Sequence, residues 1–172
     1  MTTALSRAPL PGRCHGAPRR CQTESNEAAW HDPRMADDPL RARESLVVQP
    51  IGVVRSTLRA IADAPNQAYR GAPEAWIDIE PAYADALHRI EPGDELIVLT
   101  WLHLADRETL QTHPMGDETI PLTGVFRTRS SARPNPIGVH RVTVTGLDGA
   151  CIRVDALEAI DGTPIIDLKI AL

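Results

Sequence analysis

The stretch that most restricts how this chain can fold is residues 124–139, which read GVFRTRSSARPNPIGV. Its two prolines fix their own φ at about −65° and bias the residue before each of them towards an extended conformation. The asparagine between them and the glycine that follows tolerate turns. We therefore expect a stiff loop, with strands at 125–128 and 139–145 on either side of it.

Three arginines, Arg127, Arg129 and Arg133, lie in this stiff loop. Arginines at such positions are often a solvated or salt-bridged face, which is one interpretation of the pattern. The other is a binding loop, because a rigid backbone can hold charged groups in fixed positions for a ligand.

Length and charge define the domain. A chain of 172 residues allows one domain whose core needs neither disulfides nor metal. Residues 1–45 lack apolar periodicity, so we expect a disordered extension there and a folded domain at 46–172. Of the 18 basic and 23 acidic residues, 13 and 20 fall within 35–172. This acidic balance opposes nucleic-acid binding, which depends on neutralising phosphates.

The folded part has the texture of short β-strands. The dipeptide Asp148-Gly149 predicts a hairpin between two of them. There is no GxGxxG and no Walker loop, so a Rossmann sheet is not expected. The pattern favours a mainly β fold, an antiparallel barrel or sandwich with one or two short peripheral helices. Strands are expected at 46–54, 75–79, 95–104, 139–147, 151–157 and 163–168, and a short helix at 81–90.

Composition also bears on the compartment and on metals. No apolar run approaches the about 20 residues of a membrane span, and the first residues lack a secretory signal. We therefore expect a cytoplasmic protein without membrane contact. The odd cysteine set, which includes Cys151, predicts no disulfide framework. Cys14, His15 and Cys21 lack the paired spacing of a zinc site, so no metal is expected.

Two motifs in the chain are similar to signatures of the TsaA-like (TrmO) family. One family pattern runs approximately FxTRSPxRPNPIG followed by a hydrophobic residue, and this chain has FRTRSSARPNPIGV at 126–139. The other, DGTPxxDxKPY, is matched by DGTPIIDLK at 161–169. The resemblance begins near IGVVRS at 51–56 and covers essentially the whole folded part.

The resemblance implies a small β-barrel, usually dimeric, that binds S-adenosylmethionine and methylates N6 of threonylcarbamoyladenosine at position 37 of tRNA. Its expected partners are therefore tRNA and a second copy of the chain. Longer family members continue past KPY into a C-terminal domain, whereas this chain reads DLKIAL. Two alternatives stay open: a methyltransferase for a small molecule with the same cofactor site, and a non-catalytic module that binds S-adenosylmethionine or RNA.

By position, the resemblance also implies which residues contact the cofactor. Arg129 suits its carboxylate, and oxygen acceptors such as Gln67 and Asp161 suit its ribose and amino group. Asn66 stands where the family has an arginine, so one charge-assisted contact is lost. The implied cofactor contacts are Pro65, Asn66, Gln67, His103, Leu104, Arg129, Val139, Asp161, Gly162, Thr163 and Pro164.

Methyl transfer to a nitrogen of low basicity requires that its proton be removed or its charge dispersed. Among the matched positions we nominate His103, expected at the end of the strand over 95–104, and Asp161 as bases. The expected substrate contacts are Arg127, Arg133, Asn135 and Arg141.

Overall fold

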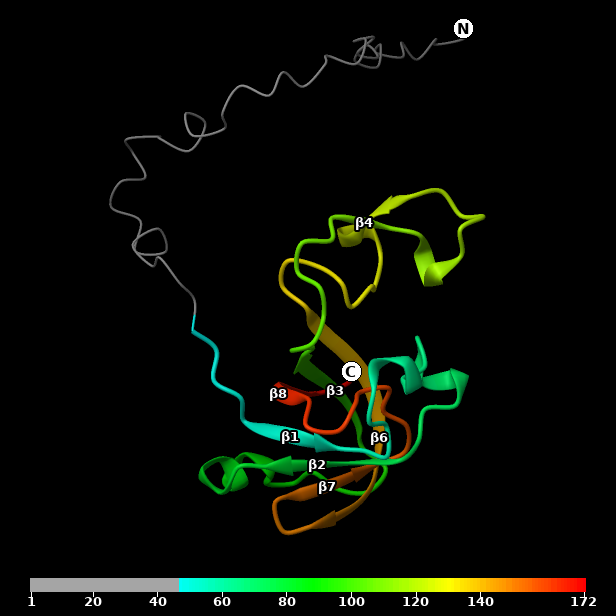
Figure 1. Ribbon diagram of the computed structural model, residues 1–172. Helices are drawn as coiled ribbons and strands as arrows, with labels where there is room; N and C mark the ends of the chain where they lie inside the picture. The colour runs from blue at the N-terminus through cyan, green and yellow to red at the C-terminus, as the bar shows by residue number, and fades with distance from the viewer. Residues whose placement is uncertain (1–46) are drawn as a thin grey trace, which may run out of the picture. The chain divides into compact units, whose positions relative to one another are not determined.

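A closed antiparallel barrel forms the body of the protein (Figure 1). The computed structural model describes residues 47–172, and the extension predicted at 1–45 lies outside them. Within the described residues the barrel order is β1, β2, β7, β6, β3, β8, and β8 pairs back to β1. The predicted antiparallel barrel is confirmed. Its strands are β1 (Gly52–Arg55), β2 (Ala75–Ile79), β3 (Glu95–Trp101), β6 (Ile137–Asp148), β7 (Cys151–Val154) and β8 (Pro164–Ile170).

Alternation along the strands builds the core. In β2, Ala75, Ile77 and Ile79 are buried while Trp76 is exposed, as the period of two predicts. β6 alternates in the same way, with the even-numbered residues from 138 to 144 buried. The fully buried apolar side chains of the core include Val54, Ile77, Val98, Ile152, Val154, Leu157 and Ile165.

The hairpin predicted at Asp148-Gly149 joins β6 to β7. Asp148 pairs with Cys151, so the turn consists of Gly149 and Ala150. Gly149 has a φ of 59°, and glycine adopts positive φ without a steric penalty. A glycine first in a two-residue turn gives the twist that an antiparallel hairpin needs.

One predicted strand is wrong. Residues 125–128 form the 3-10 helix η7 (Val125–Arg127) and the residue that ends it, Thr128. The guanidinium of Arg133 donates to the carbonyl oxygens of both Val125 and Thr128, at 3.1 and 2.7 Å. One side chain therefore satisfies two backbone acceptors of the turn. These contacts from Arg133 outweigh the β propensity of the segment.

The strand predicted over 95–104 ends early, at Trp101. The N–H of Leu102 still donates to the carbonyl of Pro136, at 2.8 Å, and the chain then turns, with Ala105 donating to Leu102 at 2.9 Å. His103 therefore lies in a turn at the end of the barrel instead of on β3. Two further elements are shorter than predicted. The strand predicted at 46–54 is β1 (Gly52–Arg55), and the helix predicted at 81–90 is η5 (Pro81–Leu87).

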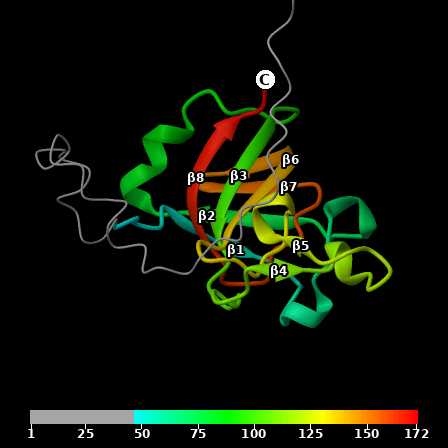
Figure 2. The same ribbon diagram turned by 90° about the horizontal axis from the view of Figure 1, so that it is seen from above.

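Residues 102–136, called the insert below, leave the barrel between β3 and β6 and lie beside it (Figures 1 and 2). A two-stranded sheet of β4 (Gln111–Thr112) and β5 (Thr123–Gly124) gives the insert its only sheet pairing among the described residues. Large apolar side chains on it are exposed, and Phe126 keeps 84% of its surface accessible. The other short helices are η3 (Ile61–Asp63), η4 (Ala68–Arg70) and η6 (Pro114–Gly116).

Over residues 47–172, none of these helices has the length and apolar character needed to cross a membrane.

Candidate functional site

A cavity of about 500 Å³ is lined jointly by the insert and by one end of the barrel. The signature loop, residues 125–136, contributes one wall and the start of β6 another. Its lining comes from six stretches of chain that are distant in sequence, within 61–67, 102–105, 112–116, 127–133, 137–140 and 158–163.

The cavity brings together most of the predicted cofactor contacts. Three consecutive residues come from the loop between η3 and η4, two from the turn after β3, and the rest from the signature loop, β6 and the segment before β8. The predicted contacts that line it are Pro65, Asn66, Gln67, His103, Leu104, Arg129, Val139 and Thr163. Asp161, Gly162 and Pro164 are not among the lining residues.

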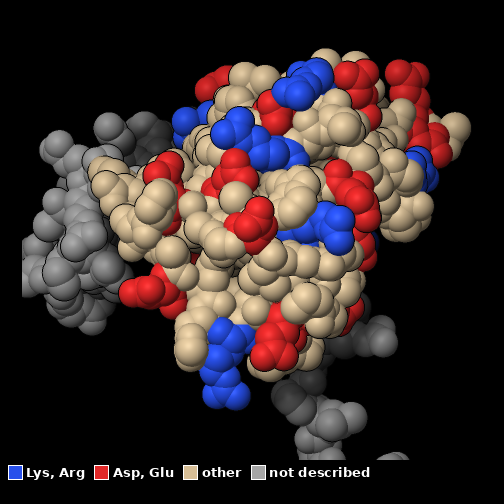
Figure 3. Space-filling model, turned by 90° about the horizontal axis from the view of Figure 1, so that it is seen from below, with Lys and Arg blue, Asp and Glu red and all other residues tan. Residues whose placement is uncertain are grey.

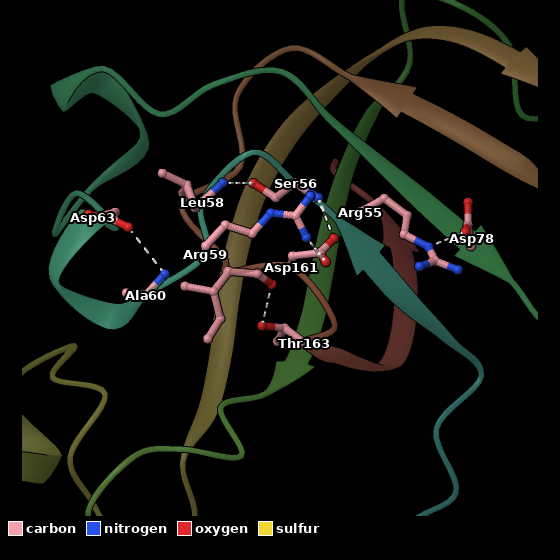
Figure 4. Close-up of polar contacts among 10 residues, drawn as sticks. Arg55, Ser56, Leu58, Arg59, Ala60, Asp63, Asp78, Asp161 and Thr163 are labelled. Carbon is pink, nitrogen blue, oxygen red and sulfur yellow. Dashed lines mark hydrogen bonds and ion pairs between the residues drawn. The ribbon is translucent and has the colours of Figure 1, made fainter.

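Asp161 is engaged with its own fold (Figure 4). Its carboxylate forms an ion pair with Arg59 and accepts a hydrogen bond from the N–H of Ser56, at 3.1 Å. The next residue, Gly162, has a φ of 78° and donates to the carbonyl of Val54, at 2.8 Å. These hydrogen bonds hold the DGTP turn against the end of β1. Arg59 was not predicted, because nothing in the sequence links positions 102 residues apart.

Two arginines of the signature loop, Arg133 and Arg129, differ in their burial and in their hydrogen-bond partners. Arg133 is half-buried and donates to the carbonyls of Val125, Thr128 and Ser130, so it holds the loop together. Arg129 is exposed and donates to the carbonyl of Val139, another predicted contact.

The predicted substrate contacts do not form one cluster. Arg127 and Arg133 line the cavity, whereas Asn135 and Arg141 do not. Arg141 lies on the outer face of β6 and pairs with Glu95 on β3, which raises the pKa of its guanidinium.

Sequence reasoning missed a buried polar group, Thr100, His140 and Glu158, at the cavity end of the barrel. Nε2 of His140 lies 2.9 Å from Oγ1 of Thr100. Nδ1 of His140 lies 3.1 Å from Oε1 of Glu158, although the angle is too poor for a well-formed hydrogen bond. His140 and Glu158 both line the cavity.

Glu158 is ionised despite its burial. Burial by itself raises the pKa of its carboxyl, but the contact with His140 and the charges of His140 and Arg129 outweigh it, and the net pKa is lowered. A negative charge is therefore fixed in the wall of the cavity.

Gly138 makes room for this group. A methyl group at its Cα would overlap Oγ1 of Thr100 and lie 2.6 Å from Nε2 of His140. The glycine of the RPNPIG motif therefore allows the threonine and histidine to meet. A histidine at an inward position of an alternating strand was a usable signal, whereas Glu158 sits in an irregular segment and gave none.

The cavity offers three kinds of chemistry: arginines for an anion, histidines for proton transfer and one carboxylate for a cation. Among residues 47–172 there is no group of three His, Cys, Asp or Glu side chains that could hold a metal ion.

Comparison with known proteins places this architecture among described families. The family model of the tRNA-methyltransferase O N-terminal domain matches residues 53–171. A probable S-adenosyl-L-methionine-binding protein of Methanothermobacter thermautotrophicus is 43% identical over 122 residues, which are 71% of this chain and 87% of the relative. An S-adenosyl-L-methionine-binding protein of Archaeoglobus fulgidus is 40% identical over 124 residues, 72% of this chain and 88% of the relative.

The fold is also similar to solved structures. The crystal structure of TrmO from Pseudomonas aeruginosa superposes with a TM-score of 0.60 at 25% identity, over 74% of this chain. The match covers 56% of that protein, so this chain spans just over half its length.

Proposed function

The chain belongs to the tRNA-methyltransferase O N-terminal domain family, and from this premise we propose that it transfers a methyl group from S-adenosylmethionine to N6 of threonylcarbamoyladenosine at position 37 of tRNA. Membership confirms the family expected from the two motifs. It also confirms the expected class of enzyme and its cofactor, a methyltransferase dependent on S-adenosylmethionine. The acceptor is the part that we propose.

The observation that carries the proposal is the convergence of the predicted cofactor positions on one cavity. Its volume of about 500 Å³ falls in the range of about 300–1,000 Å³ that holds small ligands. Leu102 and Ile160 supply apolar wall for an adenine, and Arg129 supplies a cation for a carboxylate. The residues present therefore fit the cofactor.

The protein's part in the reaction is alignment and proton handling. The bound cofactor supplies an electrophilic methyl group, and attack by the nucleophilic nitrogen needs the two reactants in line. Of the two nominated bases, His103 lines the cavity and Asp161 does not. We assign proton removal to His103, while Asp161, paired with Arg59, holds the turn that precedes Thr163.

A tRNA acceptor is supported by the exposed Arg127 at the cavity, which suits a phosphate. Such an acceptor implies that the enzyme acts in the cytoplasm. We also propose a homodimer, because Leu110, Leu122 and Phe126 expose apolar surface on the insert that a second copy would cover. The molar mass in solution, measured by light scattering, tests the dimer.

One observation favours a second candidate, methylation of a small molecule at the same site. Arg141, expected on the substrate, is paired with Glu95 away from the cavity. Figure 3 shows the lower side of Figure 1, opposite the insert, and on that face basic side chains lie among acidic ones without forming a continuous basic surface. An acceptor that fits within the cavity would not need such a surface.

The test has a binding stage and a reaction stage. Calorimetric titration should give saturable binding of S-adenosylmethionine, and saturation at about a hundred times Kd should stabilise the fold by about 2.7 kcal/mol. Binding should weaken on Arg129→Met. Arg55→Met is the matched control, because Arg55 pairs with Asp78 and does not line the cavity.

In the reaction stage, tRNA that carries threonylcarbamoyladenosine is incubated with protein and cofactor, and its nucleosides are analysed by mass spectrometry. A mass gain of one methyl group on that nucleoside supports the proposal, and His103→Ala should reduce turnover far more than cofactor affinity. Cofactor binding without methylated tRNA would overturn the tRNA acceptor and favour the small molecule.

A further inference from the structure

Glu158 is the single Asp or Glu among the described residues that line the cavity. Its side chain keeps 16% of its surface accessible, and it reaches the wall from the segment between β7 and β8. The charged side chains around it in the lining are the arginines of the signature loop. The cavity is therefore electrostatically asymmetric, with one fixed anion among cations.

This anion is held in place by the barrel. His140, which is almost fully buried on β6, lies between Glu158 and Thr100 and contacts both. Gly138 leaves the space in which His140 and Thr100 meet. Three elements, β3, β6 and the segment before β8, thus fix the position of the carboxylate.

The protein leaves this carboxylate incompletely satisfied. Its Oε2 is buried and has no hydrogen-bond donor among residues 47–172, and Nδ1 of His140 approaches Oε1 at a poor angle. An ionised carboxylate has capacity for about four donors, and buried charges normally find partners. The guanidinium of Arg129 donates to the carbonyl of Val139, and no hydrogen bond joins it to Glu158 among residues 47–172. The site lacks a cation that a ligand could bring.

The proposed cofactor has positive centres of that kind. Its sulfonium and its ammonium group are cationic, and its carboxylate suits the arginines of the lining. We propose that Glu158, positioned by His140, binds the positive centre of S-adenosylmethionine and opposes the arginines that receive its carboxylate. This inference rests on the proposed function and adds a binding residue outside both sequence motifs.

Three ligands separate the two positive centres. S-adenosylmethionine has both, S-adenosylhomocysteine has the ammonium group only, and methylthioadenosine has neither. Their dissociation constants are measured by calorimetry on the wild type, on Glu158→Gln and on Glu95→Gln. The last is the matched control, because Glu95 likewise lies beside a basic side chain, Arg141, but away from the cavity.

We expect Glu158→Gln to weaken the binding of S-adenosylmethionine by about 10- to 100-fold, because a contact to a charged group is lost. The affinity for methylthioadenosine should stay unchanged. An equal loss for S-adenosylhomocysteine would assign Glu158 to the ammonium group. An unchanged affinity for S-adenosylhomocysteine would assign Glu158 to the sulfonium. Equal effects on all three ligands, or none, would overturn the proposal.

Folding of each variant is checked by thermal unfolding. Where Glu158→Gln does not fold, Glu158→Asp makes the same comparison, because it keeps the charge beside His140 and withdraws it by one methylene. Wild-type protein that binds none of the ligands would overturn the proposed function itself. Wild-type binding with an insensitive Glu158 variant would overturn only this assignment.

Discussion

The barrel and the insert solve the same problem, holding a polypeptide in one conformation, by different means. In the barrel, strands pair in a closed ring around side chains such as Ile77 and Val98 that have no accessible surface. In the insert, two strands of two residues pair only with each other, and large apolar side chains face outwards. What orders its signature loop is a set of hydrogen bonds from Arg133 to carbonyl oxygens.

The difference separates stability from recognition. Apolar burial in the barrel supplies the main stabilising free energy, because it is roughly proportional to the area removed from water. The insert buries little and carries Arg129 and His103 into the cavity wall. We therefore expect substitutions in the barrel to change global unfolding, and those in the insert to change local order and binding.

The largest effect should follow Ile77→Ala in the barrel. The side chain is fully buried in β2, and truncation leaves a cavity that the closed ring cannot fill, so unfolding should be easier by about 2–5 kcal/mol. Urea denaturation measures this loss. The paired variant in the insert, Glu118→Ala, should change stability by less than about 0.5 kcal/mol, because that side chain is exposed and lies outside the proposed dimer face. Similar losses in both variants would remove the contrast.

Arg133→Met should act on the insert before it acts on the barrel. The change removes three hydrogen bonds from a charged donor, and we expect local opening of the signature loop to become easier by about 2–3 kcal/mol. Hydrogen exchange should show faster exchange in residues 125–136, with the β2 and β7 amides still protected. Uniformly faster exchange would mean that the two regions unfold together.

Gly138→Ala tests the junction of the two regions. The added methyl group meets two buried, hydrogen-bonded side chains, so we expect a loss of about 1–3 kcal/mol in stability. Cofactor affinity should fall with it, since His140 must move. Gly124→Ala is the control, because a Cβ there meets nothing within 4 Å. A Gly138 variant as stable as the control would show that the Thr100–His140 contact is adjustable.

The smallest effect is a pH dependence. The folded pKa of Glu158 is lowered relative to about 4.3 in an unfolded chain, so its ionised form stabilises the fold above that pH. This contribution is lost as the pH falls through the folded pKa. The difference in thermal stability between wild type and Glu158→Gln should shrink from about pH 6 to about pH 3. A difference that grows on acidification would contradict the assigned direction.

Sequence patterns were sufficient where a local rule and the fold agree. The alternation of β2, the hairpin at Gly149 and the two motifs led to the barrel and to most of the cavity lining. They failed where a side chain outside the segment decides its conformation. Val125 and Thr128 turn because Arg133 binds their carbonyls, and no propensity scale contains that contact.

The candidate site shows the same division. Asp161 lies in a motif, yet its pairing with Arg59 depends on how β1 and the DGTP turn close the barrel. Glu158 lies in no motif and no periodic element, so only the folded chain brings it to His140. Residues in irregular segments take their role from the architecture around them.

The attachment of the insert has a consequence for how such proteins can diversify. Trp101 is the last barrel residue before the insert and Ile137 is the first after it, and the two are paired across β3 and β6. Each doubling in the length of a closed loop costs only about 0.6 kcal/mol of entropy. Loops of other lengths and sequences can therefore replace the insert without altering the strand register. The barrel serves as a constant base on which natural variation, or a designer, can install a different acceptor specificity.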